Sequence, residues 1–223
     1  MNRKKHLNRK QMTTLVNNID KNKHRGMIHD TPILCKINDI VTYHNVSELS
    51  HSIDWEEDVI TTPGVSVWSG KEWVDITALR RFKSECDIIQ ILTNNSMIFV
   101  TDNYQLTMND EQVNCSTVKE GDVLDKIAMY PELTGTHDLM QLLISASNGI
   151  ELSIVYNLLI RDGFFANISV DEQDGCVLEV LDEETENETK MIKNIGKTTE
   201  YVYQIETADD SPFNIGLGGM KVQ

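Results

Sequence analysis

From residue 31 onward, short apolar and β-branched runs alternate with turn residues, and this rhythm favours a mostly β fold. The run 31–37 ends at Asn38 and Asp39, which supply a tight turn into the run 40–44. Ser69-Gly70-Lys71 separates two later runs as a hairpin with glycine at its tight position. Further turns are predicted at 94–96, 109–110 and 119–122. The predicted strands are 31–37, 40–44, 65–68, 72–76, 87–93, 97–101, 104–108, 123–124, 164–170, 176–181, 201–207 and 213–222.

The β pattern is interrupted in the middle of the chain. The segment 138–144 begins a helical run that stops at Asn148. A second helix is predicted over 152–161, and Gly163 follows it as a residue suited to the left-handed conformation at a helix end. The sequence therefore predicts β-rich ends around an α+β insert at about 125–198.

The charge is unevenly distributed. Residues 1–25 contain eight Lys/Arg and one acid, Asp20, which leaves 12 Lys/Arg against 34 Asp/Glu in the rest, a net charge of −22. Such an acidic body repels phosphate, so nucleic acid is not its expected ligand. The N-terminal segment is interpreted as a solvated basic arm, and 182–188 as an exposed acidic loop. As an alternative, the arm could contact nucleic acid through basic residues, namely Arg3, Lys4, Lys5, Arg9 and Lys10.

Metal, disulfide and membrane features are not evident in the sequence. The four cysteines are far apart without a CxxC pair, and His44 and His51 beside acids lack a regular ligand spacing. We therefore expect no cofactor and no metal. The chain lacks a run of eighteen apolar residues, and no apolar stretch follows the basic segment as in a secretory signal. An intracellular, cytoplasmic protein without membrane contact is expected.

Several segments, taken in order, resemble the motifs of inteins. The C-terminal match is the closest, because it pairs a VYD-like strand with a closing F-x-apolar-G-x-G stretch. The segment 163–170 also resembles a reduced insert of small inteins from viral family B DNA polymerases. The matching segments are Asp30-Thr31-Pro32-Ile33-Leu34, Val67 to Trp73, Arg80 to Lys83, Ile89 to Thr93, Val100 to Leu106, Val118 to Leu124, Thr199 to Thr207 and Phe213 to Val222.

This resemblance covers about residues 27–223 and implies a Hint fold, a horseshoe of β-strands that carries out protein splicing. It divides the chain into a basic arm at 1–26, a first Hint half at 27–124, a small α+β insert at 125–198 and closing Hint strands at 199–223. The insert lacks a helix with the acidic pair of a homing nuclease, so metal-dependent DNA cleavage is not expected.

The first step of splicing needs a nucleophilic side chain directly at the scissile peptide bond. Counting back from the Asp30-Thr31-Pro32 motif places Gly26 at that position, and glycine cannot form an ester or thioester. Cys35 is the nearest thiol, but it falls inside a predicted strand and is interpreted as a core residue.

Three further family positions are also changed. Tyr104 stands where the family carries a histidine that protonates the departing amide, and a phenol with a pKa near 10 transfers protons poorly there. Thr101, three residues earlier, is retained as in the family motif. Gln204 replaces a family acid, and Gln223 falls on or beside the penultimate histidine, with no asparagine after it. The resemblance therefore predicts a Hint domain that is inactive in splicing, a relic in a viral or mobile-element setting with a structural or protein-binding role.

Two alternatives stay open at this point. The domain could retain self-cleavage through a noncanonical residue such as Thr31 or Cys35. It could also be a binding module in which the basic arm recruits nucleic acid and the β body serves as a scaffold.

Overall fold

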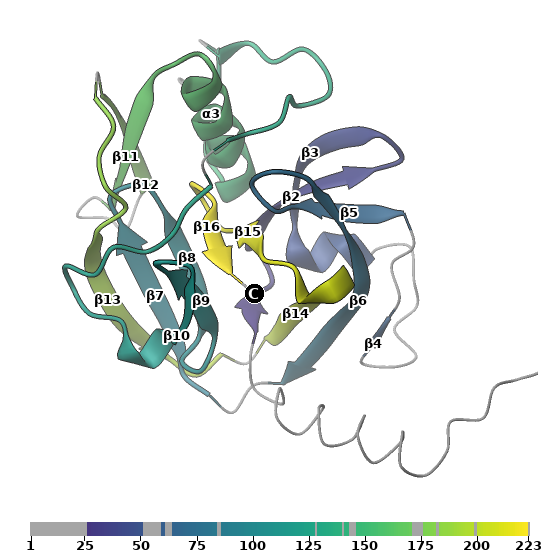
Figure 1. Cartoon of the computed structure of the whole chain (residues 1–223), viewed down its shortest axis with the longest axis vertical. Helices are drawn as coiled ribbons and strands as arrows, with labels where there is room; N and C mark the ends of the chain where they lie inside the picture. The colour runs from purple at the N-terminus through teal and green to yellow at the C-terminus, as the bar shows by residue number, and fades with distance from the viewer. Residues whose placement is uncertain are drawn as a thin grey trace, which may run out of the picture.

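The structure is a computed structural model of the chain (Figure 1). It describes residues 26–50, 59–60, 64–83, 86–127, 129–139, 141–142, 146–170, 176–181, 183–198 and 200–222. The basic arm at 1–25, the turn at 171–175 and Gln223 lie outside the described residues.

Strands dominate the described residues, and most of them belong to one extended antiparallel sheet (Figure 1). The strands are β1 (Met27–Ile28), β2 (Pro32–Ile37), β3 (Ile40–Asn45), β4 (Val59–Ile60), β5 (Val65–Trp68), β6 (Trp73–Lys83), β7 (Ile88–Thr93), β8 (Met97–Thr101), β9 (Gln105–Met108), β10 (Glu111–Asn114), β11 (Phe165–Val170), β12 (Cys176–Leu181), β13 (Thr189–Gly196), β14 (Tyr201–Thr207), β15 (Phe213–Ile215) and β16 (Met220–Val222). The helical elements are α3 (Gly149–Arg161) and the 3₁₀ turns η1 (Val46–Ser50), η2 (Cys115–Thr117) and η3 (Ala208–Asp210). The mostly β fold predicted from the sequence is confirmed.

The sheet brings the two ends of the described chain into its middle. Its strand order is β10-β9-β16-β15-β2-β5-β6-β14-β1-β8-β7-β13, with β3 paired to β2 and β4 to β6. The last strand, β16, pairs with β9, and β1 lies between β14 and β8. Strands from the N-terminal and C-terminal parts of the sequence therefore pair within one sheet.

Turn chemistry explains the predicted hairpins. Asn38 and Asp39 have φ of 49° and 65°, the left-handed pair of a two-residue turn between β2 and β3. Asn109 and Asp110 repeat this geometry, with φ of 55° and 61°, and lead from β9 into β10, a strand that the sequence analysis did not predict. Asn and Asp tolerate this region because their short side chains add little steric conflict.

Several further strand assignments differ from the sequence prediction. The predicted strand 123–124 is only an isolated bridge between Val123 and Glu188, and β1 and β4 were not predicted. β6 continues to Lys83 instead of ending near residue 76, because its second half pairs with β14 despite the basic run it contains. β13 was not predicted, since it lies at the sheet edge with mostly exposed or half-buried side chains. It pairs with β7, so the segment 189–196 of the predicted insert is hydrogen-bonded to the main sheet. The predicted strand 213–222 is two strands, β15 and β16, joined by a glycine-rich turn.

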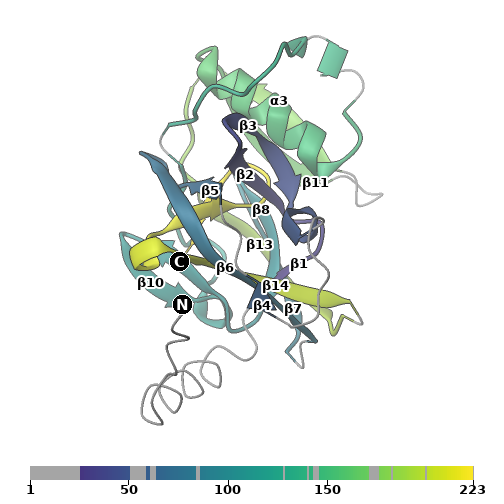
Figure 2. The ribbon, with the colours of Figure 1, turned by 90° about the vertical axis from the view of Figure 1, so that its right-hand side faces the viewer.

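The predicted α+β insert contains α3 and the β11–β12 ribbon. α3 begins at Gly149, three residues earlier than predicted, because the Asn148 side chain accepts a hydrogen bond from the N–H of Glu151. Figure 2 shows α3 lying across the end of the sheet near β2 and β3, and it also contacts β11. In the predicted helix 138–144, the described residues Leu139, Gln141 and Leu142 are helical.

Apolar side chains form one large core inside the sheet and a second under the insert. The large core includes the fully buried Ile33, Leu79 and Phe213. The second joins Tyr156 of α3 and Ile168 of β11 to Leu217 of the terminal turn. The insert is thereby packed onto the residues that connect β15 to β16.

Candidate functional site

Gly26 and Thr101, two positions singled out by the sequence, are in direct contact. The N–H of Gly26 donates to Thr101 Oγ1 at 2.9 Å, and the N–H of Thr101 donates to the carbonyl of Gly26 at 2.8 Å. The Thr101 hydroxyl in turn donates to Asn103 Oδ1 at 2.9 Å. Asn103 thus orients the hydroxyl so that its oxygen accepts from Gly26. Both backbone groups of residue 26 are therefore held in place, although glycine has no side chain that could react.

The space around Gly26 is too small for a side chain. A Cβ atom at this position would lie 2.8 Å from Cβ of Val202 and 3.1 Å from the carbonyl oxygen of Tyr203. Both neighbours belong to β14, which pairs with β1 immediately after Gly26. Any nucleophilic residue carries a Cβ, so placing one here requires β14 or the chain around residue 26 to move.

Tyr104 is a core residue. Only 3% of its surface is exposed, and it belongs to the large apolar core. Its N–H donates to the carbonyl of Thr101, and its own carbonyl accepts from the N–H of Cys115. Thr101 to Tyr104 therefore form a turn leading into β9, with a packed phenol at the position that the sequence resemblance matched to a histidine.

Gln204 lies on β14, the strand that borders Gly26. Its half-buried side chain places Oε1 away from solvent without a hydrogen-bond partner. Burying a carbonyl oxygen without a hydrogen-bond partner is unfavourable in free energy relative to its hydrated state. An amide at this position also does not release a proton, so the acid–base chemistry of a carboxyl group is absent.

The terminal strand reaches the same segment from the other side. Val222 pairs with Leu106 of β9, two residues after Tyr104, while Gly26 pairs with Thr101. The two ends of the described chain therefore converge on residues 101–106 (Figure 1). Gln223 lies outside the described residues.

The turn before β16 is held by many contacts. The carbonyl oxygen of Gly218 accepts from the hydroxyls of Ser96, at 3.2 Å, and Tyr130, at 2.9 Å. The carbonyl of Gly219 accepts from the N–H of Ile127 at 3.0 Å. Residues of the predicted insert, Ile127 and Tyr130, thus fix the turn that leads to the chain's last strand.

The two alternative nucleophiles considered from sequence are both buried. Cys35 is fully buried in β2, and burial raises its pKa well above that of an ordinary thiol, so the reactive thiolate is disfavoured. Thr31 is 4% exposed, and its hydroxyl has no hydrogen-bond partner that could act as a base. Neither side chain is supported as a replacement for the missing nucleophile.

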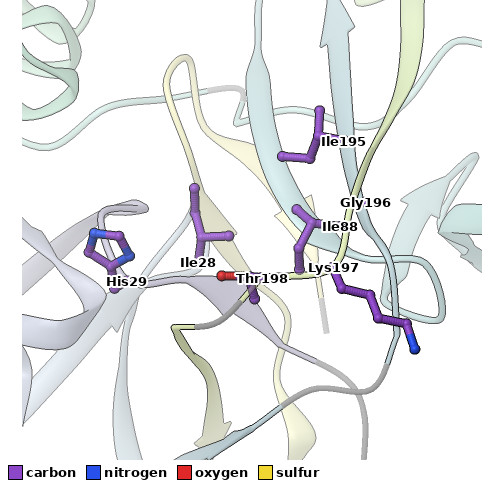
Figure 3. A pocket seen from close by; sticks show the side chains of 7 residues that line it. All are labelled: Ile28, His29, Ile88, Ile195, Gly196, Lys197 and Thr198. Atoms are coloured by element: carbon purple, nitrogen blue, oxygen red, sulfur yellow. The ribbon is translucent and has the colours of Figure 1, made fainter.

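A small cavity of about 240 Å³ lies beside β1. Figure 3 shows Ile28, Ile88 and Ile195 around it, with the Lys197 amine directed away from Ile28. Its lining is mainly apolar, and His29 and Lys197 are its ionisable residues.

The described residues contain no cluster of three or more His, Cys, Asp or Glu that could hold a metal ion. Cys35, Cys86, Cys115 and Cys176 all lie in the described part, and no disulfide joins them. No helix in the described ranges is both long and apolar enough to cross a membrane.

Sequence reasoning missed Asn103 and Val202 as parts of the site. Asn103 has a local signal, since a side-chain acceptor two residues after a threonine often takes its hydroxyl proton. Val202 has none, because its proximity to Gly26 arises only when β14 pairs with β1.

No family model matches this chain, and no curated protein matches its sequence. Solved structures do resemble it. The transcription factor IIB Mvu mini-intein has a TM-score of 0.55 at 14% identity, over 90% of this chain and 99% of that one. The Pab PolII intein gives 0.54 at 15% identity, over 88% and 100%. An intein from a hyperthermophile gives 0.52 at 15% identity, over 89% and 99%. Across nearly its whole length, the chain therefore has the Hint fold of inteins.

Proposed function

We propose that this chain is an intein-derived Hint domain that no longer splices and has a structural or protein-binding role. One observation carries the proposal: the position that must hold the first nucleophile is a glycine packed against Val202 and Tyr203. Restoring catalysis would therefore require new space as well as a new side chain.

The other changed positions support the same conclusion. Tyr104 is packed into the core, Gln204 presents an amide, and the two other candidate nucleophiles, Thr31 and Cys35, are buried. What persists is the framework: Thr101 still binds the backbone of residue 26, and the last strand still reaches β9. A framework retained without its reactive groups is what we expect of a domain kept for its shape. We further infer, from the sequence of 163–170, an origin among small inteins of viral family B DNA polymerases.

Intact mass spectrometry of the full chain tests the loss of activity. The freshly expressed protein is followed for hours at neutral pH, with and without an added thiol that would cleave a thioester. We expect an unchanged mass in both samples. An active mini-intein treated in parallel supplies the positive control.

A second measurement tests ligation directly. The chain extended by one asparagine is placed between two folded reporter domains, and the products are separated by mass. We expect only the intact fusion. Joined reporters, or a thiol-accelerated break before Gly26, would show that another residue has taken over the nucleophile's role.

A further inference from the structure

A groove of about 850 Å³ lies between the β1–β2 connection, β8 and the first turn of α3. It is lined by the start of the Hint fold on one side and by the insert on the other. Its size falls within the usual range of ligand-binding sites. Gly26, Thr101, Tyr104 and Gln204 are not part of its lining, whereas Thr31, considered above as an alternative nucleophile, is.

The charged residues of the groove are all acidic. Asp30, Glu48 and Glu151 line it, and its lining includes no lysine or arginine. Two of the carboxylates are fixed by local hydrogen bonds. Glu48 accepts from the N–H of Asn45 at 3.0 Å, and Glu151 accepts from the N–H of Ser147 at 2.8 Å. Fixed carboxylates lose little side-chain entropy when they meet a cation.

A buried threonine also lines the groove. Thr31 is 4% exposed, and its Oγ1 makes no hydrogen bond. That oxygen is itself covered, so Thr31 meets the groove through its other atoms and offers no hydrogen bond to a ligand there.

The class of ligand is inferred from the negative charge and the apolar lining of the groove. The described residues place no three carboxylates close enough to share a metal ion, so separate cations suit them better. Between the acids lie apolar side chains, including Pro32, Phe99 and Leu217. The methylene stems of arginine and lysine pack on such surfaces while their charged ends reach carboxylates.

We propose that this groove binds a peptide segment of a partner protein in which arginine or lysine alternates with apolar residues. The proposal gives a ligand class to the binding role inferred above. It does not depend on the loss of splicing, because peptide binding and cleavage are measured separately.

Fluorescence anisotropy tests the proposal with a labelled hexapeptide of alternating leucine and arginine. The protein is the full chain with Arg3, Lys4, Lys5, Arg9 and Lys10 replaced by glutamine, which removes competition from its own cations. We expect saturable binding that weakens as salt is raised. A hexapeptide of alternating leucine and glutamate should not bind.

Matched variants separate the groove from the general negative charge. Asp30→Asn, Glu48→Gln and Glu151→Gln together should weaken binding about tenfold, as expected for three partly exposed ion pairs. The control removes three exposed acids outside the groove by Glu111→Gln, Glu179→Gln and Glu183→Gln. It should change the affinity less than about twofold, since distant exposed charges are screened.

Single variants guard against misfolding as an explanation. Asp30 is exposed, so Asp30→Asn should leave the melting temperature unchanged and weaken binding about threefold. Thr31→Val removes the covered hydroxyl at nearly constant volume and should leave the affinity unchanged, because that oxygen does not reach the groove. Absence of peptide binding, or equal losses in the groove and control triple variants, would overturn the proposal.

Discussion

Gly26 and Gly218 are both too tightly packed for a side chain, yet their surroundings differ. A Cβ at Gly26 would meet mainly the side chain of Val202, at 2.8 Å, whereas one at Gly218 would lie 1.7 Å from the carbonyl oxygen of Asn95. Cβ of Val202 moves only with the β14 backbone, and the Asn95 carbonyl moves only with the β7–β8 loop. The overlap is nevertheless much deeper at the C-terminal turn than at the N-terminal junction.

Contacts with the insert accompany the close packing at Gly218. Asn95 is 2% exposed, and its amide donates to the carbonyl of Ala166 and to the Thr185 hydroxyl. Tyr130 binds the Gly218 carbonyl directly. The loop that meets Gly218 is thus held by the predicted insert, while Gly26 depends on Thr101 and β14. Both sites thus exclude a side chain, the C-terminal turn through a loop held by the insert and the N-terminal junction through β14.

The largest expected effect is that of Gly218→Ala. Its φ of +76° disfavours any side chain, and the Cβ would overlap backbone, so we expect the free energy of unfolding to fall by about 3–5 kcal/mol. Urea denaturation measures this. Gly64→Ala is the control, because Gly64 has φ of +79° but open space around it, and should lose only about 1 kcal/mol. Equal losses would show that the contact with Asn95 is unimportant.

Gly26→Cys should cost less, about 1–3 kcal/mol, because its Cβ overlaps its neighbours less deeply. Combining it with Val202→Ala should be less destabilising than the sum of the single changes by about 1 kcal/mol, since alanine removes Cγ2 at 2.9 Å although it keeps Cβ. A double-mutant cycle in urea measures the coupling. Additive effects would indicate that the backbone, and not Val202, limits the space.

Thr101→Val should cost about 1–2 kcal/mol, since it leaves the buried N–H of Gly26 without its acceptor. Amide hydrogen exchange followed by NMR should show faster exchange at Gly26. Thr117→Val provides a comparison, because Thr117 donates to the carbonyl of Asn114 in an exposed turn. Unchanged exchange at Gly26 would argue that its backbone is held by β14 alone.

Tyr130→Phe should have the smallest effect, about 0.5–1 kcal/mol, because the Gly218 carbonyl keeps its hydrogen bond from Ser96. Tyr130→Phe combined with Ser96→Ala should cost more than the sum, since the carbonyl then loses both donors. Urea denaturation of the three variants checks this. If the two effects simply add, the two hydroxyl groups stabilise the turn independently of each other.

Much of the fold could be predicted because local chemistry and tertiary pairing agree. The Asn38-Asp39 turn and the helix after Asn148 follow from the properties of these residues. β13 and the second half of β6 could not be predicted, because their exposed and charged side chains carry little strand signal. The turn between β15 and β16 was not predicted within 213–222, since the glycines there fit either a flexible strand or a hairpin.

The sequence by itself determined the strand rhythm, the turn residues and the identity of the groups at the changed positions, because these depend on residues adjacent in the chain. Tertiary structure decided the rest. Only the pairing of β1 with β14 places Val202 against Gly26, and only the folded insert brings Tyr130 to Gly218. The same folding assembles Asp30, Glu48 and Glu151 around one groove. Distances between residues far apart in sequence are set by sheet pairing and core packing, which no local pattern records.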